Sequence, residues 1–231
     1  MTLIICDVFL NYDFLVLCKK KRKKMFGILF NTIYFIMLFR HKEHDVKPNT
    51  TLLMWIDKKI CFGYLPNELL QKIKNPLFDV TLCFFYLFHF IIPITYTCYF
   101  YCQNQLQLFL LLWGMTNLQA YCIQKIIPTS PPWYNNNDLN HKEGDLKRID
   151  ELIGQPLFYS IYKDNNLTYG ALPSLHVAWV MCFVLLNGFN VWSTAHLFCI
   201  SLAAIYFQHH YLIDVLLGIL IPYLSYEIIK I

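Results

Sequence analysis

The stretches Tyr169-Gly-Ala-Leu-Pro-Ser-Leu-His176 and His209-His-Tyr-Leu-Ile-Asp214 are short polar insertions in a strongly apolar C-terminal half. Each stands at the start of an apolar run of the kind that crosses membranes, and ionisable side chains at such places are functional candidates by default. In the first stretch the proline and serine predict a helix start, with Ser174 as the N-cap and His176 in the first turn.

The second stretch pairs a histidine with an acid. His210 and Asp214 are four residues apart, so on a helix they share a face, and the carboxylate can hold one imidazole nitrogen. Two histidines, one of them backed by an acid, would then lie beside a helix N-terminus that favours an anion. This combination predicts phosphoryl transfer that needs no metal and no other cofactor.

Composition places the chain among integral membrane proteins. It has 231 residues, 57% hydrophobic and only 15% charged, with a mean hydropathy of +0.40, so we expect an all-α, polytopic bundle. The basic tract Lys19–Lys24 is typical of the cytosolic flank of a membrane helix, and we expect no nucleic-acid partner. Nine cysteines show no ligand spacing, which indicates neither a zinc site nor a disulfide framework.

Hydropathy predicts about six membrane spans. Residues 1–18 carry two aspartates and are a doubtful span, so residues 1–75 form an N-terminal region with the basic tract and one span. Residues 76–231 form the catalytic membrane domain. The predicted spans are Met25–Phe39, Val80–Tyr101, Gln105–Ile127, Leu175–Trp192, Ala195–Phe207 and Tyr211–Ile229.

The order of these spans places His176 and His210 on the same side of the membrane, together with the polar segment 128–172. If Lys19–Lys24 is cytosolic, counting spans places that side in a lumen or outside the cell. The lysines of residues 40–75 favour the opposite orientation, because the same count makes that loop lumenal too.

The two histidine stretches resemble the motifs of the type 2 phosphatidic acid phosphatase superfamily, Pro-Ser-x-His and His-x-x-x-Asp. Here these are Pro173–His176 and His210–Asp214. Within the superfamily the chain is most similar to the fungal-type inositol phosphorylceramide synthases over about residues 76–222. The stretches that carry this likeness, besides the two histidine motifs, are Phe78–Val80, Phe88–Phe90, Pro128–Tyr134 and Gly144–Asp150.

Two phosphate-gripping elements of the hydrolytic members are missing. Those members have a Lys-x6-Arg-Pro element, but Lys125 is followed by Pro132 where the arginine would fall. They also have an arginine six residues before the second histidine, where this chain has Ala204. Both losses argue against a plain lipid phosphatase and agree with the synthase subgroup.

The resemblance implies a role for each candidate residue. His210 would be the nucleophile, Asp214 would fix its tautomer, and His176 would be the general acid and then the general base. The residues implied to bind the substrate are Arg148, Ser174, Trp133 and Tyr134. For Arg148 a salt bridge is an open alternative, and for Trp133 and Tyr134 an aromatic anchor at the membrane surface is another.

The implied activity is transfer of phosphoinositol from phosphatidylinositol to ceramide, in a Golgi or other endomembrane with a lumenal site. The alternatives are a lipid phosphate phosphatase, a ceramide transferase that uses phosphocholine or phosphoethanolamine, and a non-enzymatic membrane scaffold. Membrane lipids are the expected partners. The residues leave open both the oligomeric state and a small regulatory membrane subunit.

Overall fold

The structure is a computed structural model that describes residues 22–40, 48–135, 142–163 and 169–230. These residues contain no β-strand, only isolated bridges that join Asn49, Thr129 and Gly170. The predicted all-α class is therefore confirmed. The helices are 22–39, α2 Leu52–Ile60, α3 Pro66–Gln71, α4 Pro76–Cys102, α5 Leu106–Ile126, α6 Pro132–Asn135, the 3₁₀ turn η1 Gly144–Leu146, α7 Lys147–Ile153, α8 Leu157–Tyr162, α9 Leu175–Asn187, α10 Val191–Tyr206 and α11 Leu212–Lys230.

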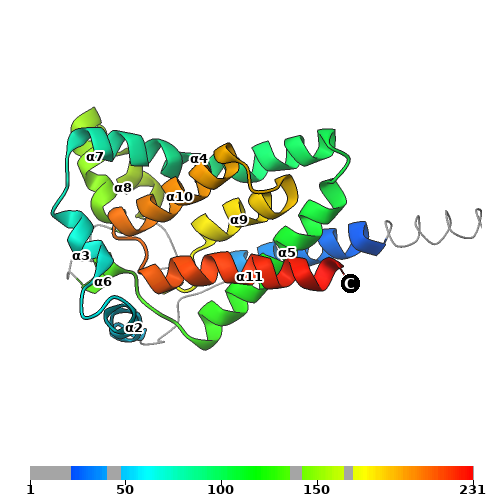
Figure 1. Cartoon of the computed structure of the whole chain (residues 1–231), viewed down its shortest axis with the longest axis horizontal. Coiled ribbons are helices and arrows are strands. Elements are labelled where there is room, and N and C mark those ends of the chain that lie inside the picture. The colour runs from blue at the N-terminus through cyan, green and yellow to red at the C-terminus, as the bar shows by residue number, and fades with distance from the viewer. Residues whose placement is uncertain (1–21, 41–47, 136–141, 164–168, 231) are drawn as a thin grey trace, which may run out of the picture.

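Long helices form the body of the bundle, and short helices gather at one end of it. In Figure 1, α4 and α11 run along the length of the molecule, α9 and α10 slope between them, and α5 crosses the view steeply, while α2, α3, α6, α7 and α8 lie together at the end opposite the C-terminus. Lys23 at the start of the 22–39 helix donates a hydrogen bond to the Ile229 carbonyl at 3.2 Å. The basic residues of that helix therefore lie at the end away from the short helices.

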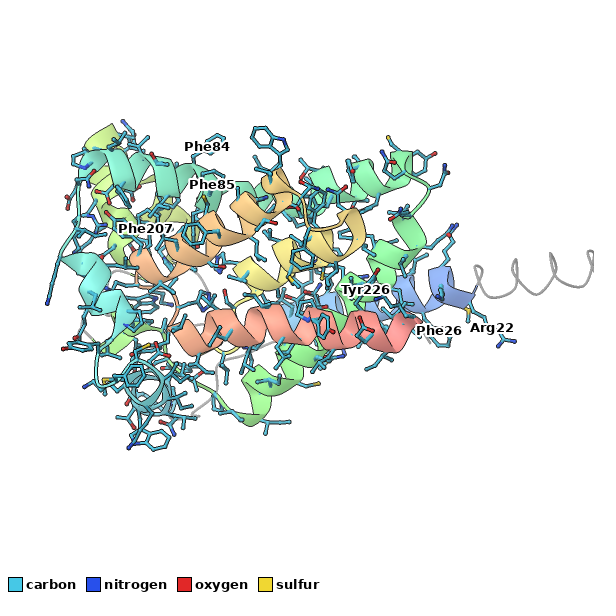
Figure 2. The ribbon with its side chains drawn as sticks, viewed as in Figure 1. Arg22, Phe26, Phe84, Phe85, Phe207 and Tyr226 are labelled. Atoms are coloured by element: carbon cyan, nitrogen blue, oxygen red, sulfur yellow. The ribbon has the colours of Figure 1, made fainter. Side chains whose placement is uncertain are left out.

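Helix α9 is the centre of the bundle, packed against α4, α5, α10 and α11. Its residues Val177, Val180 and Val184 are fully buried, as expected for a helix that is apolar on all sides. The outer helices expose large apolar side chains instead. Phe26 and Phe84, labelled in Figure 2, are 42% and 56% exposed, which suits a surface that faces lipid.

The prediction of six spans is not confirmed. Within the described residues, α5 and α11 are long and apolar enough to cross a membrane, and α4 would be a third if its two halves form one span. Helices α9 and α10 are shorter, with 13 and 16 residues. At about 1.5 Å per residue they reach roughly 20 and 24 Å, less than the ~30 Å hydrocarbon layer. The division of the chain at residue 75 stays a prediction.

The break between α9 and α10 lies earlier than the predicted one near residue 194. Gly188 has a positive φ of 83° and ends α9, because glycine adopts that conformation without a steric cost. The Asn190 side chain then accepts hydrogen bonds from the Trp192 and Ser193 amides and caps α10. Apolar residues directly follow Asn190, so hydropathy alone did not predict a helix start at this residue.

Helix α4 is bent by 54° between its halves Pro76–Leu87 and Ile91–Cys102. Pro93 follows the bend directly. Its ring has no N–H and collides with the carbonyl of the residue four positions earlier, which is the usual cause of a kink. The predicted span Val80–Tyr101 therefore lies in one continuous helix whose two halves have different axis directions.

Candidate active site

The two histidines predicted to act together meet at the end of the bundle that holds the short helices. His176 is in the first turn of α9, and His210 is in the link between α10 and α11. The His176 Nδ1 atom lies 3.0 Å from the His210 Nε2 atom. The fold therefore brings the two imidazoles into direct hydrogen-bond contact, which places both on the same side of the bundle.

The second ring nitrogen of His210 determines its tautomer. Its Nδ1–H donates to the Ala171 carbonyl oxygen at 3.0 Å. A neutral imidazole with its proton on Nδ1 has a free lone pair on Nε2. His176 Nδ1–H therefore donates to His210 Nε2, whose lone pair is the acceptor of this hydrogen bond. The role of His210 as nucleophile stays a prediction.

Asp214 reaches the same imidazole by a different route from the expected one. His210 is outside the helix, because α11 begins at Leu212, so the four-residue spacing does not act along a helical face. Asp214 Oδ2 lies 3.5 Å from His210 Nδ1 and accepts a hydrogen bond from the Tyr211 amide at 2.8 Å. The carboxylate thus supports the imidazole beside Ala171 and also closes the turn that carries it.

Thr129 holds the Ala171 carbonyl in place. Its amide donates to the Tyr169 carbonyl at 3.1 Å, and its carbonyl accepts from the Ala171 amide at 3.3 Å. Its hydroxyl also accepts from the Leu172 amide at 3.3 Å. The segment after α5 is therefore hydrogen-bonded to the segment before α9 and fixes its backbone.

Ser174 is the N-cap of α9, as predicted, but its side chain makes no capping hydrogen bond. The Oγ atom is buried without a hydrogen-bond partner. The Ser174 amide donates to the Asp214 carbonyl at 3.0 Å, which ties the start of α9 to α11. A buried hydroxyl without a partner costs free energy, so this Oγ is suited to bind a ligand oxygen.

Aromatic rings enclose the histidines. The Tyr86 ring stacks on the His176 ring with centroids 4.6 Å apart, and the Tyr86 hydroxyl lies 3.0 Å from the Tyr162 hydroxyl. His209 Nε2–H donates to the Glu143 carbonyl at 2.9 Å. This hydrogen bond links the 207–211 segment to the residue before η1.

Arg148 lies in an ion-pair cluster. Its guanidinium contacts Asp79 at 2.7 Å and Asp145 at 2.8 Å, and it lies over the Tyr206 ring at 5.2 Å. The structure therefore contains the salt bridge that was the alternative to substrate binding by Arg148. With two carboxylates balancing its charge, a phosphate ligand role for Arg148 requires rearrangement and stays a prediction.

Trp133 and Tyr134 lie in α6, beside the segments that carry the histidines. The Trp133 amide donates to the Gln208 carbonyl at 3.2 Å, and its side chain is buried. Tyr134 packs edge-on against Tyr169 with ring centroids 5.7 Å apart. Contact of either side chain with substrate stays a prediction.

Within the described ranges, no group of three or more His, Cys, Asp or Glu side chains is arranged to hold a metal ion.

The sequence profile of the PAP2 superfamily matches residues 51–228, most of the chain. The chain belongs to the PAP2 superfamily. It is 34% identical over 201 residues to a phosphoinositol dihydroceramide synthase of Bacteroides thetaiotaomicron, a match that covers 77% of this chain and 66% of that protein. No solved structure matches.

Fungal relatives are more distant. The catalytic subunit of inositol phosphorylceramide synthase from Saccharomyces cerevisiae is 27% identical over 51% of this chain and 32% of its own length. Inositol phosphorylceramide synthase from Candida albicans is 28% identical over 51% of this chain and 28% of its own length. The chain spans less than two thirds of the length of these relatives.

In this PAP2 superfamily chain, Ala204 stands where the hydrolytic members have an arginine. Ala204 is fully buried, and its carbonyl accepts hydrogen bonds from the His209 and His210 amides at 3.1 and 3.0 Å. These bonds fold the link tightly back onto the end of α10. The backbone at residue 204 thus helps to place His210.

Gly218 lets α9 and α11 approach closely at the site. A Cβ atom there would lie 2.6 Å from the Ser174 carbonyl oxygen. We expect Gly218→Ala to force the helices apart and destabilise the protein by about 1–3 kcal/mol, the usual cost of overpacking. Thermal unfolding in detergent measures this, with Leu220→Ala on the exposed face of α11 as the control. Equal unfolding temperatures for Gly218→Ala and the wild type would refute the close contact.

The protein should become less stable as the pH is lowered, because two histidines are buried in the PAP2 fold. Burial lowers the pKa of His210 to about 4 and that of His209 to about 3. The unfolded chain, with ordinary histidine pKa values, binds more protons below about pH 6.5. Stability is therefore complete above that pH and is lost progressively as the pH falls toward 4.

The measurement is the thermal unfolding temperature at several values between pH 7.5 and 5. We expect a steady decline for the wild type and a shallower one for His209→Asn, which keeps a donor for Glu143 but has no proton to gain. Parallel curves for the two proteins would contradict the assignment.

Sequence reasoning missed Tyr86 and Thr129. Thr129 lies inside the quoted stretch Pro128–Tyr134, so a signal for that segment existed, although nothing singled out the threonine. Tyr86 stands among many aromatic residues of an apolar helix. Only the packing of α4 against α9 distinguishes it.

Proposed function

We propose that this protein is a sphingolipid synthase that transfers phosphoinositol from phosphatidylinositol to ceramide. The products are inositol phosphorylceramide and diacylglycerol. The observation that carries the proposal is the 3.0 Å contact between His176 Nδ1 and His210 Nε2. The names of the relatives, which are phosphoinositol and inositol phosphorylceramide synthases, support the choice of donor and acceptor.

In the first half of the reaction, His210 Nε2 attacks the phosphorus of phosphatidylinositol. An N–P bond forms and the bond from phosphorus to the diacylglycerol oxygen breaks. His176 Nδ1–H gives its proton to that oxygen, so neutral diacylglycerol leaves. The Ala171 carbonyl and Asp214 stabilise the positive charge that develops on the His210 ring.

In the second half, the primary hydroxyl of ceramide attacks the phosphohistidine. His176, which has lost its proton, takes the hydroxyl proton as general base. An O–P bond forms, the N–P bond breaks, and the lone pair returns to His210 Nε2. Both histidines thus end in their starting protonation states.

The phosphoryl group must replace the hydrogen bond between the two rings, because a separation of 3.0 Å leaves no room for it. The buried Ser174 Oγ and the N-terminus of α9 are suited to hold the phosphate oxygens. Arg148, Trp133 and Tyr134 complete the proposed binding region. Low exposure of His210, at 5%, supports a site in which a lipid hydroxyl can compete with water.

Orientation follows from the ends of the bundle. The basic residues Arg22–Lys24 begin the helix whose start contacts the end of α11. In Figure 1 the link between α10 and α11, which carries His210, lies at the opposite end of the bundle. If these residues are cytosolic, the site faces a lumen or the cell exterior. We propose a lumenal site in an endomembrane such as the Golgi, which follows the family resemblance.

The test uses purified protein in mixed micelles with labelled phosphatidylinositol, with and without ceramide. We expect inositol phosphorylceramide only when ceramide is present, and no product with phosphatidylcholine or phosphatidylethanolamine as donor. Inositol phosphate released regardless of ceramide would instead identify a phosphatase. Transfer from another donor would identify a different ceramide transferase, and inertness with every donor would favour a scaffold.

A further inference from the structure

Asp57 is a buried carboxylate far from the histidines in the sequence. It belongs to α2, and it is fully buried while the next residue, Lys58, is exposed. A buried charge is costly unless hydrogen bonds compensate it. The groups that donate hydrogen bonds to Asp57 should therefore indicate the role of the carboxylate.

Both carboxylate oxygens of Asp57 bind the start of α11. Oδ2 accepts from the Leu212 amide at 2.8 Å, and Oδ1 accepts from the Ile213 amide at 2.9 Å. Leu212 and Ile213 are the first two residues of α11. The first amides of a helix have no acceptor within the helix, and a negative charge there is favourable. Asp57 thus caps α11 from a separate helix.

The capped turn is the one that carries the reacting imidazole. His210 and Tyr211 directly precede α11, and Asp214 closes the turn through its bond to the Tyr211 amide. Leu53 of the same helix shares a buried apolar cluster with Tyr211 and with Ala171, whose carbonyl accepts from His210 Nδ1. Helix α2 therefore contacts both supports of the nucleophile.

We propose that Asp57 is a positioning residue that sets the place of His210 for phosphoryl transfer. The inference rests on the proposed function, because it assigns His210 the role of nucleophile. A shift of the turn by about 1 Å would misalign Nε2 with the phosphorus, and misplacements of that size cost up to roughly 10²-fold in rate. Substrate binding, which involves other groups, should change little.

The experiment compares Asp57→Ala and Asp57→Asn with the wild type in the micelle assay. We expect kcat to fall about 10–100-fold for Asp57→Ala with KM for both lipids nearly unchanged. Asp57→Asn keeps one carbonyl oxygen, so it should recover part of the lost kcat. Lys58→Ala, its exposed neighbour on α2, should behave as the wild type.

Folded Asp57→Ala protein with a wild-type kcat would overturn the proposal, and so would a raised KM with an unchanged kcat. If Asp57→Ala does not fold, Asp57→Asn is the test: a reduced kcat supports the role of Asp57, and a wild-type kcat overturns it. A wild-type protein that only hydrolyses phosphatidylinositol would refute the transferase assignment. The same variants would then be compared by their hydrolysis rates, and an unchanged rate would still overturn the role of Asp57.

Discussion

His210→Ala should reduce ceramide-dependent transfer by at least about 10⁴-fold, the scale seen when a nucleophile is removed from an enzyme that forms a covalent intermediate. Without His210 Nε2 there is no atom to form the N–P bond, and the remaining site can only bind the donor. KM should therefore stay measurable if any residual turnover exists. The measurement is initial rate against phosphatidylinositol concentration at saturating ceramide.

His196→Ala is the matched control for this loss. His196 is in α10, where its Nδ1 lies 3.2 Å from the Tyr96 hydroxyl, and it has no part in the proposed chemistry. It should keep most of the activity. A His210→Ala protein that is folded and retains more than a few per cent of wild-type transfer would rule out His210 as the nucleophile.

His176→Ala should lower transfer by about 10²–10⁴-fold, the usual contribution of a general acid or base. The size of the loss should depend on the leaving group. A diacylglycerol alkoxide needs a proton as it leaves, whereas a nitrophenolate does not. With a nitrophenyl ester of inositol phosphate as donor, formation of the phosphohistidine should be nearly as fast in His176→Ala as in the wild type.

The burst of nitrophenolate in the absence of ceramide measures this step alone. Wild-type protein and His176→Ala should give similar bursts. When ceramide is then added, turnover should be fast in the wild type and slow in the variant, because the ceramide hydroxyl lacks its general base there. Equal losses with the diacylglycerol and nitrophenyl donors would contradict the assignment of His176 as general acid.

The all-α class and the meeting of the two histidines could be predicted from the sequence. Composition alone indicates a membrane helical bundle, and the order of the apolar runs returns His210 to the side of His176. The lengths of the helices were predicted less accurately than the fold class. Hydropathy does not detect the cap at Asn190 or the positive φ of Gly188, so α9 is shorter than its apolar run.

The local geometry of the site was predicted only in part. The spacing of His210 and Asp214 indicates a contact, but a turn before α11 makes it, and the Ala171 carbonyl is the nearer partner. Nothing near Arg148 in the sequence points to Asp79, which is 69 residues away. Contacts between distant segments, such as Asp57 with α11, depend on packing that no local pattern encodes.

Trapping the covalent intermediate is the most direct test of transfer through a phosphohistidine at His210. The protein is incubated with labelled phosphatidylinositol without ceramide, quenched at alkaline pH, digested and examined by mass spectrometry. We predict phosphoinositol on His210, absent from His210→Ala and discharged to inositol phosphorylceramide when ceramide is added before the quench. Label on another residue, or a trapped adduct that ceramide does not discharge, would contradict transfer through His210.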